Sequence, residues 1–303
     1  MKRQVFIGMD IGGTHSRLCV LDKDKNVLHL EKLLTSKLAR NGFIDGIISL
    51  IDDHIHKLNV QVDRIIVGLP ATISKDRTSV LSTPNLKIDI QEFNSLVSSL
   101  ESQLNCKAEL ERDVNLQLAY DVEMFELTDK SVIGCYVGTG FGFSVWMNKD
   151  IYVGANGVAG EIGHIPYGDD GKVCGCGKIG CLETLVSGTQ LKHEYESQNA
   201  SYPISDFFLQ QDNQVYIDRL VTNLAKAVTT SIKLFDPDVV LLGGGVIDMN
   251  AFPFPKLEQQ VLSMTSSPIS RQTVALTKAS SSSFNGALGA AQRAEGRYRQ
   301  SKR

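Results

Sequence analysis

The residues with the clearest potential for chemistry are three cysteines on one glycine-rich loop. Residues 174–183 read CGCGKIGCLE, so Cys174, Cys176 and Cys181 form a C-x-C-x4-C pattern. Thiols crowded in this way either close a disulfide knot or hold a metal ion together with a fourth ligand from elsewhere in the chain. Two cysteines separated by a single residue are poor disulfide partners, because an S–S bond needs a particular approach of the two Cβ atoms. The choice between the two chemistries also depends on the redox compartment.

The composition predicts a cytoplasmic protein. The 303 residues carry a net charge of −3 and 42% apolar side chains, which suits one or two globular domains. No basic excess indicates nucleic acid as a partner, and no apolar run approaches the roughly 20 residues of a membrane span. The opening residues, MKRQVFIGMDIGG, contain too short an apolar run for a signal peptide. Cytoplasmic thiols stay reduced, so the composition favours the metal site over the disulfide knot.

A second set of residues suits phosphate chemistry. Residues 5–21 and 132–147 are both apolar hairpins whose turns are rich in Gly and Thr, DIGGTHS and GTGFGFS. The backbone N–H groups of two such turns can cradle phosphates, although either turn alone is more typical of an ordinary hairpin. The repetition, with an acid at Asp10, favours the phosphate interpretation. The chain has no Walker A pattern and no G-x-G-x-x-G that opens a helix, which argues against P-loop and Rossmann folds.

The elements that must position these residues alternate between strands and helices in two similar halves. In the first half, the pattern predicts strands at residues 4–10, 16–22, 27–32, 64–70 and 108–110. It predicts helices at residues 44–58 and 93–104, on either side of the strand 64–70. From residue 132 the strand pattern starts again, followed by a long helix over 217–232, strands over 238–245 and 273–279, and a final helix from about residue 285. This order indicates an α/β fold with an internal repeat.

The motifs DIGGTHS, ERDVN, VGTGFG, GEIGH, CGCGKIGCLE and LLGGG, in this order, resemble those of the ROK family of sugar kinases and repressors. The combination of GEIGH with CGCGKIGCLE is the most specific part of the resemblance. It implies an actin-like (ribonuclease H-like) two-domain fold with a central cleft. We expect an N-terminal domain over residues 1–117 and a C-terminal domain over 118–303, with the final helix packed back on the N-terminal domain. ROK repressors carry a helix-turn-helix ahead of the first glycine turn, and the residues up to Asp10 leave no room for one, so a kinase is favoured.

The resemblance also implies roles for individual residues. His164 becomes the fourth ligand beside Cys174, Cys176 and Cys181, and this closed set suits a structural, tetrahedral Zn²⁺. Asp113 is the expected catalytic base, although an aspartate there also suits a helix cap. The expected sugar contacts are Asn85, Arg112, Asp113, Glu161, His164 and Glu183. The residues expected to hold ATP and Mg²⁺ are Asp10, Gly12, Gly13, Thr14, Gly138, Thr139, Gly140, Gly243, Gly244 and Gly245.

The activity that the resemblance implies is an ATP-dependent hexose 6-kinase. Overall similarity within the family favours D-allose as the hexose. Glucose, fructose and N-acetylmannosamine kinases share every motif above, and a sugar-binding regulator without catalysis is the alternative from another class. Arg112 stands where the family usually has Asn, and it either contacts the sugar or pairs with Glu111 at the surface. The expected partners are a hexose and ATP, with no nucleic acid and no membrane, and the expected assembly is a homodimer.

Overall fold

The computed structural model describes residues 2–40, 42–83, 90–168, 171–266 and 268–302. The chain divides into two compact units. Unit 1 comprises Met1–Met124, Val153–Ala159 and Ser282–Arg303, and unit 2 comprises Phe125–Tyr152 and Gly160–Ser281. The expected boundary between residues 117 and 118 falls inside the helix α5 (Asp113–Met124), all of which belongs to unit 1.

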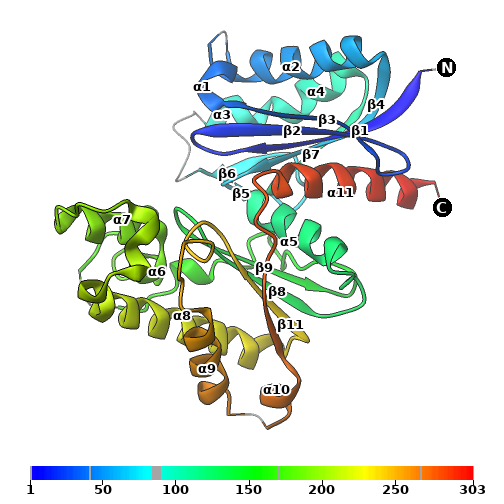
Figure 1. Cartoon of the computed structure of the whole chain (residues 1–303). Helices are drawn as coiled ribbons and strands as arrows, with labels where there is room; N and C mark the ends of the chain where they lie inside the picture. The colour runs from blue at the N-terminus through cyan, green and yellow to red at the C-terminus, as the bar shows by residue number, and fades with distance from the viewer. Residues whose placement is uncertain (1, 41, 84–89, 169–170, 267, 303) are drawn as a thin grey trace. The chain divides into compact units, whose positions relative to one another are not determined.

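Unit 1 contains a five-stranded sheet with the order β3-β2-β1-β4-β7 (Figure 1). The hairpin strands β1, β2 and β3 are antiparallel, whereas β1, β4 and β7 run parallel to one another. The strands are β1 (Arg3–Ile11), β2 (His15–Asp22), β3 (Val27–Leu34), β4 (Val60–Leu69) and β7 (Lys107–Arg112), and β5 (Thr72–Ile73) pairs with β6 (Val80–Ser82) in a separate small sheet. The helices of the unit are α1 (Thr35–Leu38), α2 (Phe43–Leu58), α3 (Ile90–Asn94), α4 (Leu96–Leu104), α5 and α11 (Asn285–Ser301).

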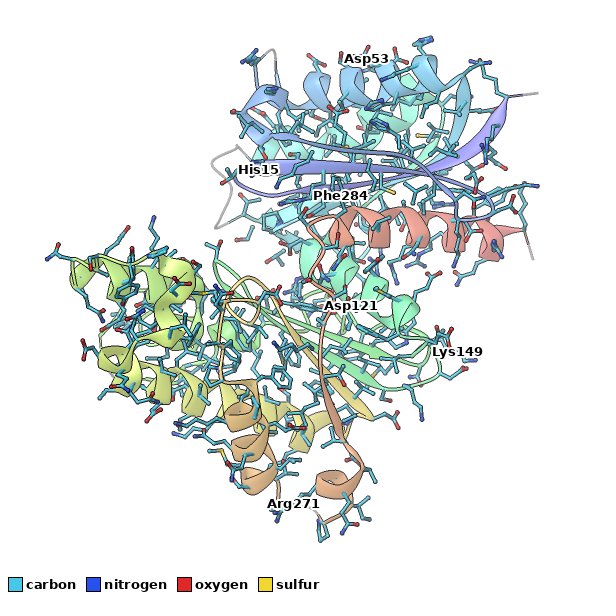
Figure 2. All side chains as sticks on the ribbon, in the orientation of Figure 1. His15, Asp53, Asp121, Lys149, Arg271 and Phe284 are labelled. Atoms are coloured by element: carbon cyan, nitrogen blue, oxygen red, sulfur yellow. The ribbon has the colours of Figure 1, made fainter. Side chains whose placement is uncertain are left out.

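Two helices cover one face of this sheet because their apolar residues recur at helical spacing. Ile47 and Ile51 of α2 and Leu100 of α4 are fully buried in the core on that face. Asp53, which Figure 2 labels on α2, is exposed on the opposite side of the helix. The helix α2 ends at Leu58, and the next residue, Asn59, has a left-handed backbone (φ 50°) that suits a helix cap. The result is one apolar layer between the sheet and α2 and α4.

The last helix, α11, packs against the other face of the same sheet (Figure 1). It begins after Phe284, which Figure 2 labels. A Cβ added at Gly8 of β1 would lie 2.1 Å from the carbonyl oxygen of Ala287, so the strand and the helix approach backbone to backbone. Ala290 and Ala294 of α11 are buried against Phe6 of β1. Small residues on both elements therefore let α11 complete the core of unit 1.

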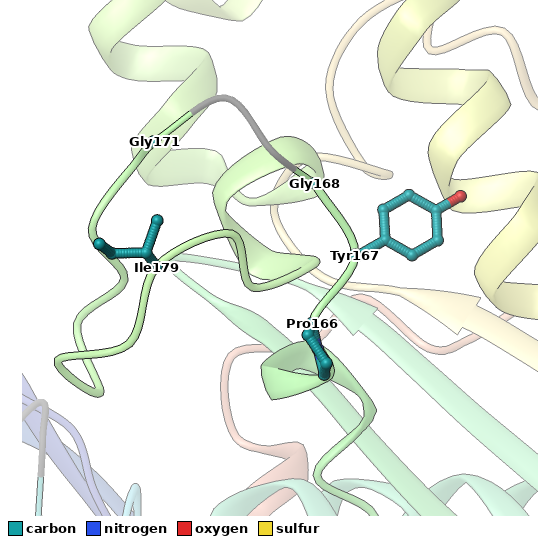
Figure 3. A pocket seen from close by; sticks show the side chains of 5 residues that line it. All are labelled: Pro166, Tyr167, Gly168, Gly171 and Ile179. Atoms are coloured by element: carbon teal, nitrogen blue, oxygen red, sulfur yellow. The ribbon is translucent and has the colours of Figure 1, made fainter.

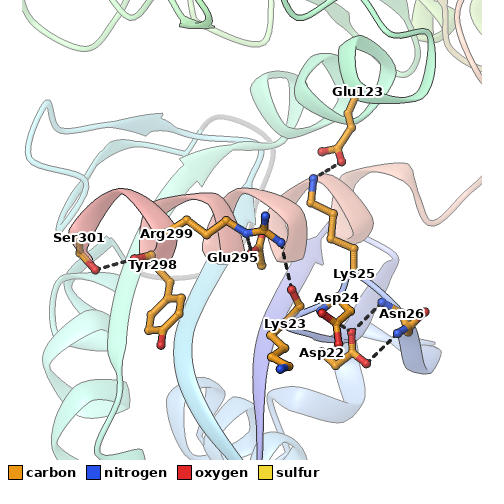
Figure 4. A network of polar contacts seen from close by, with 10 residues as sticks. All are labelled: Asp22, Lys23, Asp24, Lys25, Asn26, Glu123, Glu295, Tyr298, Arg299 and Ser301. Carbon is orange, nitrogen blue, oxygen red and sulfur yellow. Dashed lines mark hydrogen bonds and ion pairs between the residues drawn. The ribbon is translucent and has the colours of Figure 1, made fainter. Parts of the chain in front are cut away.

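Polar contacts tie the turn after β2 to α11 (Figure 4). The carboxylate of Asp22, at the end of β2, accepts hydrogen bonds from the amide and the side chain of Asn26 at 2.8 and 2.9 Å. On α11, Arg299 pairs with Glu295 and donates to the carbonyl oxygen of Lys23 at 3.1 Å. These contacts hold the turn against the helix.

Unit 2 repeats the sheet of unit 1. Its strand order is β10-β9-β8-β11-β12, with β8, β9 and β10 antiparallel and β8, β11 and β12 parallel. The strands are β8 (Val132–Val137), β9 (Phe141–Met147), β10 (Asp150–Ile151), β11 (Val239–Gly243) and β12 (Ala275–Lys278). The helices are η1 (Ile162–His164), α6 (Glu183–Val186), α7 (Gly188–Ser197), η2 (Ile204–Leu209), η3 (Gln211–Asn213), α8 (Gln214–Phe235), α9 (Phe254–Met264) and α10 (Pro268–Thr273). The expected α/β fold with an internal repeat is confirmed.

The core of unit 2 lies between its sheet and the long helix α8. Leu220, Leu224 and Val228 of α8 are buried together with Phe143 of β9 and Val240 of β11. No helix among the described residues combines the length and the apolar composition that a membrane crossing needs.

Candidate functional site

The first glycine turn, Gly12–Thr14, joins β1 to β2 in unit 1. Its ends are fixed by hydrogen bonds from the Gly12 amide to His15 O (3.0 Å) and from the Thr35 amide to Thr14 O (3.0 Å). The hydroxyl of Thr35 donates to Gly12 O at 2.6 Å. Gly13 and Thr14 are exposed at the tip. The turn is therefore fixed by the Gly12 amide and by the carbonyl groups of Gly12 and Thr14, and its tip is exposed.

Asp10 and Asp113 lie at the same edge of the unit 1 sheet. Asp10 is near the end of β1 and Asp113 follows β7, and parallel strands bring their carboxyl ends to one edge. Burial, and next the charge of Asp113, raise the pKa of Asp10 to about 7, although Arg17 lowers it. The Arg17 guanidinium lies 3.7 Å from the Asp10 carboxylate. The negative charge of Asp10 is costly beside that of Asp113, and a divalent cation between them would reduce this cost. Carboxylate oxygens are ligands that Mg²⁺ prefers.

Asp113 is the first residue of α5, and its carboxylate accepts a hydrogen bond from the Val114 amide at 2.7 Å. This contact fits the capping role that the residue type allows. The charge of Asp113 also raises the pKa of Asp10, so the Asp113 carboxylate lies close enough to Asp10 to act on it. Both roles of Asp113 are therefore compatible with its position.

Arg112, the last residue of β7, is buried with 7% of its surface exposed. Its guanidinium donates a hydrogen bond to the carbonyl oxygen of Ala159 at 2.7 Å. The carboxylate of Glu111 pairs with Arg77 and accepts a hydrogen bond from the Asn115 side chain at 2.8 Å. A surface pair between Arg112 and Glu111 is thus wrong, because both residues are buried.

Arg112 instead anchors Val153–Ala159 to unit 1, a segment that sequence reasoning did not assign there. No local pattern signals this contact. The expected sugar contact Asn85 lies outside the described residues.

In unit 2, the second glycine turn (Gly138–Gly140) joins β8 to β9. Its carbonyl groups accept hydrogen bonds from the amides of Gly188 and Thr189, to Gly138 O at 2.8 Å and to Thr139 O at 3.1 Å. Sequence reasoning missed Gly188 and Thr189, although Ser187 before them is a recognisable helix cap that accepts a hydrogen bond from Gln190 at 3.4 Å. As in unit 1, the first glycine of the turn also donates a hydrogen bond, here from the Gly138 amide to Gly140 O at 3.1 Å.

Glu183, an expected sugar contact, lies directly against this turn. Its Oε2 accepts a hydrogen bond from the Phe141 amide at 2.8 Å, and a Cβ at Gly140 would lie 2.3 Å from the same oxygen. Its other oxygen, Oε1, is 3.6 Å from the sulfur of Cys174. Glu183 therefore connects the cysteine loop with the glycine turn, and a side chain at position 140 would displace its carboxylate from this place.

The glycines at 243–245 follow β11 and differ in their surroundings. A Cβ at Gly243 would lie 2.7 Å from the Ala279 side chain, and one at Gly244, which has φ +93°, would lie 2.6 Å from Val137 O. A Cβ at Gly245 would meet nothing within 4 Å. Packing thus explains the first two glycines, and Gly245 has open space beside it.

The cysteine cluster has the geometry of a metal site. The ligand atoms of His164, Cys174, Cys176 and Cys181 all lie within 4.8 Å of one another. Two thiolates bound at about 2.3 Å to a tetrahedral Zn²⁺ lie about 3.75 Å apart, and the sulfurs of Cys176 and Cys181 are 3.6 Å apart. All six cysteines are among the described residues and each is free. The donors present fit zinc, and the disulfide alternative has no support in the structure.

The loop is preorganised by its own backbone. The Cys174 amide donates to Lys178 O at 2.8 Å, and the Gly177 amide donates to Cys174 O at 2.9 Å. A cavity of about 420 Å³ lies beside it, lined by Pro166, Tyr167, Gly168, Gly171 and Ile179 (Figure 3). None of these five described lining residues carries a charged side chain.

His164 shares its two ring nitrogens between the cluster and Glu161. Its Nδ1 is 3.5 Å from the sulfur of Cys174, and its Nε2 is 3.8 Å from a carboxylate oxygen of Glu161. The ring can therefore bind a metal through Nδ1 and still present Nε2 to a second group. The expected site residues of unit 2 thus gather around the cysteine loop and the second glycine turn.

Comparisons with known proteins identify relatives that share this architecture. An N-acetyl-D-glucosamine kinase from Haemophilus influenzae is 26% identical over 80% of this chain and 84% of its own. A ROK family glucokinase from Streptomyces griseus, solved with glucose and AMPPNP, is 25% identical with a TM-score of 0.77 over 96% of this chain and 99% of its own. A ROK family transcriptional regulator, a homologue of the E. coli MLC protein, has a TM-score of 0.81 at 19% identity and covers 97% of this chain and 78% of its own.

These neighbours confirm the actin-like two-domain fold, and the likeness to the regulator concerns the fold alone. The model of the ROK family matches residues 6–297. The chain therefore belongs to the ROK family.

Proposed function

We propose that this protein is an ATP-dependent sugar kinase that transfers the γ-phosphoryl group of ATP to the C6 hydroxyl of a hexose. The observation that carries the proposal is the pair of Asp10 and Asp113 at one edge of the unit 1 sheet. A protein that only binds sugar has no need to hold two carboxylates close enough to raise the pKa of one of them. The named kinases among its relatives support the same reading.

In this proposal Asp113 accepts the proton of the attacking hydroxyl. Phosphoryl transfer needs a positioned base and neutralised phosphate charge more than it needs covalent chemistry. Asp10 would orient Mg²⁺ through water, and the cation, when bound, neutralises charge on the phosphates. The amides at the tips of the turns Gly12–Thr14 and Gly138–Gly140 bind phosphate oxygens.

The cysteine cluster has a structural role in the proposal. His164, Cys174, Cys176 and Cys181 would hold Zn²⁺ in a closed set of four ligands, which leaves no position for a reacting water. The cluster then holds the loop that carries Glu183, whose carboxylate contacts the second glycine turn. Glu161, Glu183 and the Nε2 of His164 are the proposed partners of the sugar hydroxyls.

D-Allose is the first candidate for the hexose. The relatives described above are named as kinases of N-acetyl-D-glucosamine and glucose, so these sugars must be compared directly with D-allose. The buried Arg112 is the proposed contact that distinguishes allose from glucose, since a buried donor left without its hydroxyl partner penalises the wrong epimer. A homodimer is also proposed, and light scattering at the assay concentration checks it.

The test is ADP release measured with D-allose, D-glucose, N-acetyl-D-glucosamine, N-acetylmannosamine and D-fructose. We expect sugar-dependent ADP release, and a loss of turnover by about 10²–10⁴-fold in Asp113→Asn, with the sugar still raising the melting temperature of that variant. Sugar binding without ADP release from any member of the panel would instead support the regulator.

A further inference from the structure

A second group of metal-ligating side chains lies on the face of the unit 1 sheet that α2 covers. His29 and Glu31 stand two residues apart on the edge strand β3, and His54 comes from α2. The residues opposite them on β2 are Val20 and Leu18, which belong to the core on the α2 face. His29 and Glu31 therefore project from the sheet toward the helix that carries His54.

Both imidazole rings face one carboxylate oxygen of Glu31. His54 Nε2 lies 2.7 Å and His29 Nε2 lies 3.7 Å from Oε2 of Glu31. The centroids of the two imidazole rings are 4.3 Å apart, and one ligand atom from each of the three residues lies within 4.8 Å of the others. A tetrahedral ion with bonds of about 2.0–2.1 Å holds neighbouring ligand atoms about 3.3 Å apart, a value that the two measured separations bracket.

The hydrogen bonding of the cluster is incomplete. Glu31 Oε2 is within hydrogen-bond distance of His54 Nε2, but the distance from Glu31 Oε2 to His29 Nε2 is too long for a hydrogen bond. His29 Nε2 is a buried atom without a hydrogen-bond partner among the described residues, and the same holds for Nδ1 of His54, a residue with 6% exposure. An unsatisfied buried nitrogen costs free energy, and a cation that takes the lone pair of His29 Nε2 removes this cost at that atom. His54 faces Glu31 through its other nitrogen, Nε2, so His29 Nε2 is the unsatisfied atom that the cation would bind.

We propose that His29, Glu31 and His54 bind one divalent transition-metal ion, with Zn²⁺ as the representative cation. Two imidazoles and one carboxylate are a ligand set that zinc and other imidazole-preferring ions accept, whereas Mg²⁺ prefers oxygen ligands. Three protein ligands leave a coordination position for water or an added ligand. The side chains of His29 and Glu31 are 28% and 36% exposed, so an ion can reach the site from solvent. The bound ion would fasten the edge strand β3 to α2.

This site is separate from the cysteine cluster in sequence, unit and donor chemistry. The cysteine cluster belongs to unit 2 and offers three sulfurs and one nitrogen, whereas the His29 site belongs to unit 1 and offers two nitrogens and one oxygen. The thiolate site is expected to fill first, so the protein must already hold one zinc per chain before the second site is titrated.

The experiment counts zinc by native mass spectrometry and measures its affinity by isothermal titration calorimetry, on the full chain without an affinity tag. The starting protein carries one zinc, and Zn²⁺ alone is the probe. We expect the wild type to bind a second equivalent. His29→Ala should weaken this second equivalent by at least 100-fold, because even the loss of a group that only supports a ligand typically costs about 10–100-fold. His56→Ala is the matched control, since His56 lies on the same helix with a side chain 73% exposed and outside the cluster.

His54→Ala removes a buried side chain, so its folding is checked by circular dichroism before its result is used. The partly exposed His29 keeps the test decisive if that variant does not fold. The proposal is overturned if the wild type binds only one zinc, if His29→Ala keeps the second equivalent, or if His56→Ala loses it to the same degree.

Discussion

Asp10→Asn should make the protein more stable at pH 8 while it removes a side chain proposed for catalysis. Burial and the charge of Asp113 raise the pKa of Asp10 from 3.8 to about 7. A carboxyl with a raised pKa binds its proton more tightly in the folded state than in the unfolded state, so the stability of the wild type falls as the pH rises from about 4 to about 7. The asparagine side chain has no charged form, and the variant escapes this loss.

The magnitude follows from the pKa shift. At about 1.36 kcal/mol per pKa unit, the rise from 3.8 to about 7 corresponds to about 4 kcal/mol, of which about 2.5 kcal/mol develops between pH 5 and pH 8. These figures are ceilings, because the Asp10 side chain is 18% exposed and Gly286, at the N-terminal end of α11, lies against its carboxylate. Water and the helix N-terminus both favour the charged form.

The assay is urea unfolding at pH 5, 6, 7 and 8, followed by circular dichroism. The single tryptophan, Trp146, lies on β9 of unit 2, so its fluorescence marks the unfolding of unit 2 and helps to assign the transition of unit 1. We expect the advantage of Asp10→Asn over the wild type to grow from pH 5 to about pH 7 and to level off by pH 8. An advantage that is constant with pH, or a variant less stable than the wild type at pH 8, would refute the raised pKa.

Asp22→Asn is the matched control, because the same substitution on the neighbouring strand should act in the opposite direction. Burial alone would raise the pKa of Asp22, but hydrogen bonds from Asn26, Asp24 and Arg3 lower it to about 2. A carboxyl with a lowered pKa stabilises the folded state above its unfolded pKa, and this contribution is lost as the pH falls from about 4 toward 2. Asp22→Asn should therefore be less stable than the wild type at every pH from 5 to 8.

Three further predictions concern the cysteine loop, Arg112 and the last helix. Cys176→Ser should lose about one zinc per chain. It should also raise KM for ATP as well as for the hexose, because Glu183 contacts both the cysteine loop and the Phe141 amide of the glycine turn. Metal analysis and steady-state kinetics test this, and an unchanged KM for ATP would contradict it. Arg112→Asn should lower the ratio of kcat/KM for allose over glucose if Arg112 contacts the sugar, whereas an unchanged ratio with a lower melting temperature would leave it as the anchor of Ala159. Gly8→Ala should destabilise the protein by at least about 1–3 kcal/mol, because the new Cβ would meet the α11 backbone. Gly296→Ala, on α11 itself, is the control: its Cβ would meet nothing within 4 Å, so it should be neutral or stabilising in the same urea titration.

The sequence predicted most of the strands and the cysteine cluster because both are local patterns. Apolar runs bounded by glycine turns identified the repeated hairpins, and the C-x-C-x4-C spacing brought three ligands together within one loop. The free state of Cys19 and Cys135 inside buried strands agrees with their apolar surroundings. These features need only near neighbours in the chain to be recognised.

What the sequence did not show depends on contacts between distant segments. The hydrogen bond from Arg112 to Ala159 joins residues that share no motif, and it is tertiary packing that assigns Val153–Ala159 to unit 1. The contact of Glu183 with the Phe141 amide is equally remote in sequence. His29, Glu31 and His54 also lack a spacing that any motif describes, because β3 and α2 bring them together only after folding. A single sequence read on its own carries no signal for such pairs.

The position of α11 has a consequence for the synthesis of the protein. The sheet of unit 1 is made first, but the helix that covers its second face follows all of unit 2 in the chain. At a translation rate of about 5–20 residues per second, about 10–35 s separate the end of α5 from the emergence of that helix. During this interval Phe6 and Ile66 lack their cover of alanines. The nascent protein therefore presents an apolar surface on its first-made unit until α11 has been synthesised.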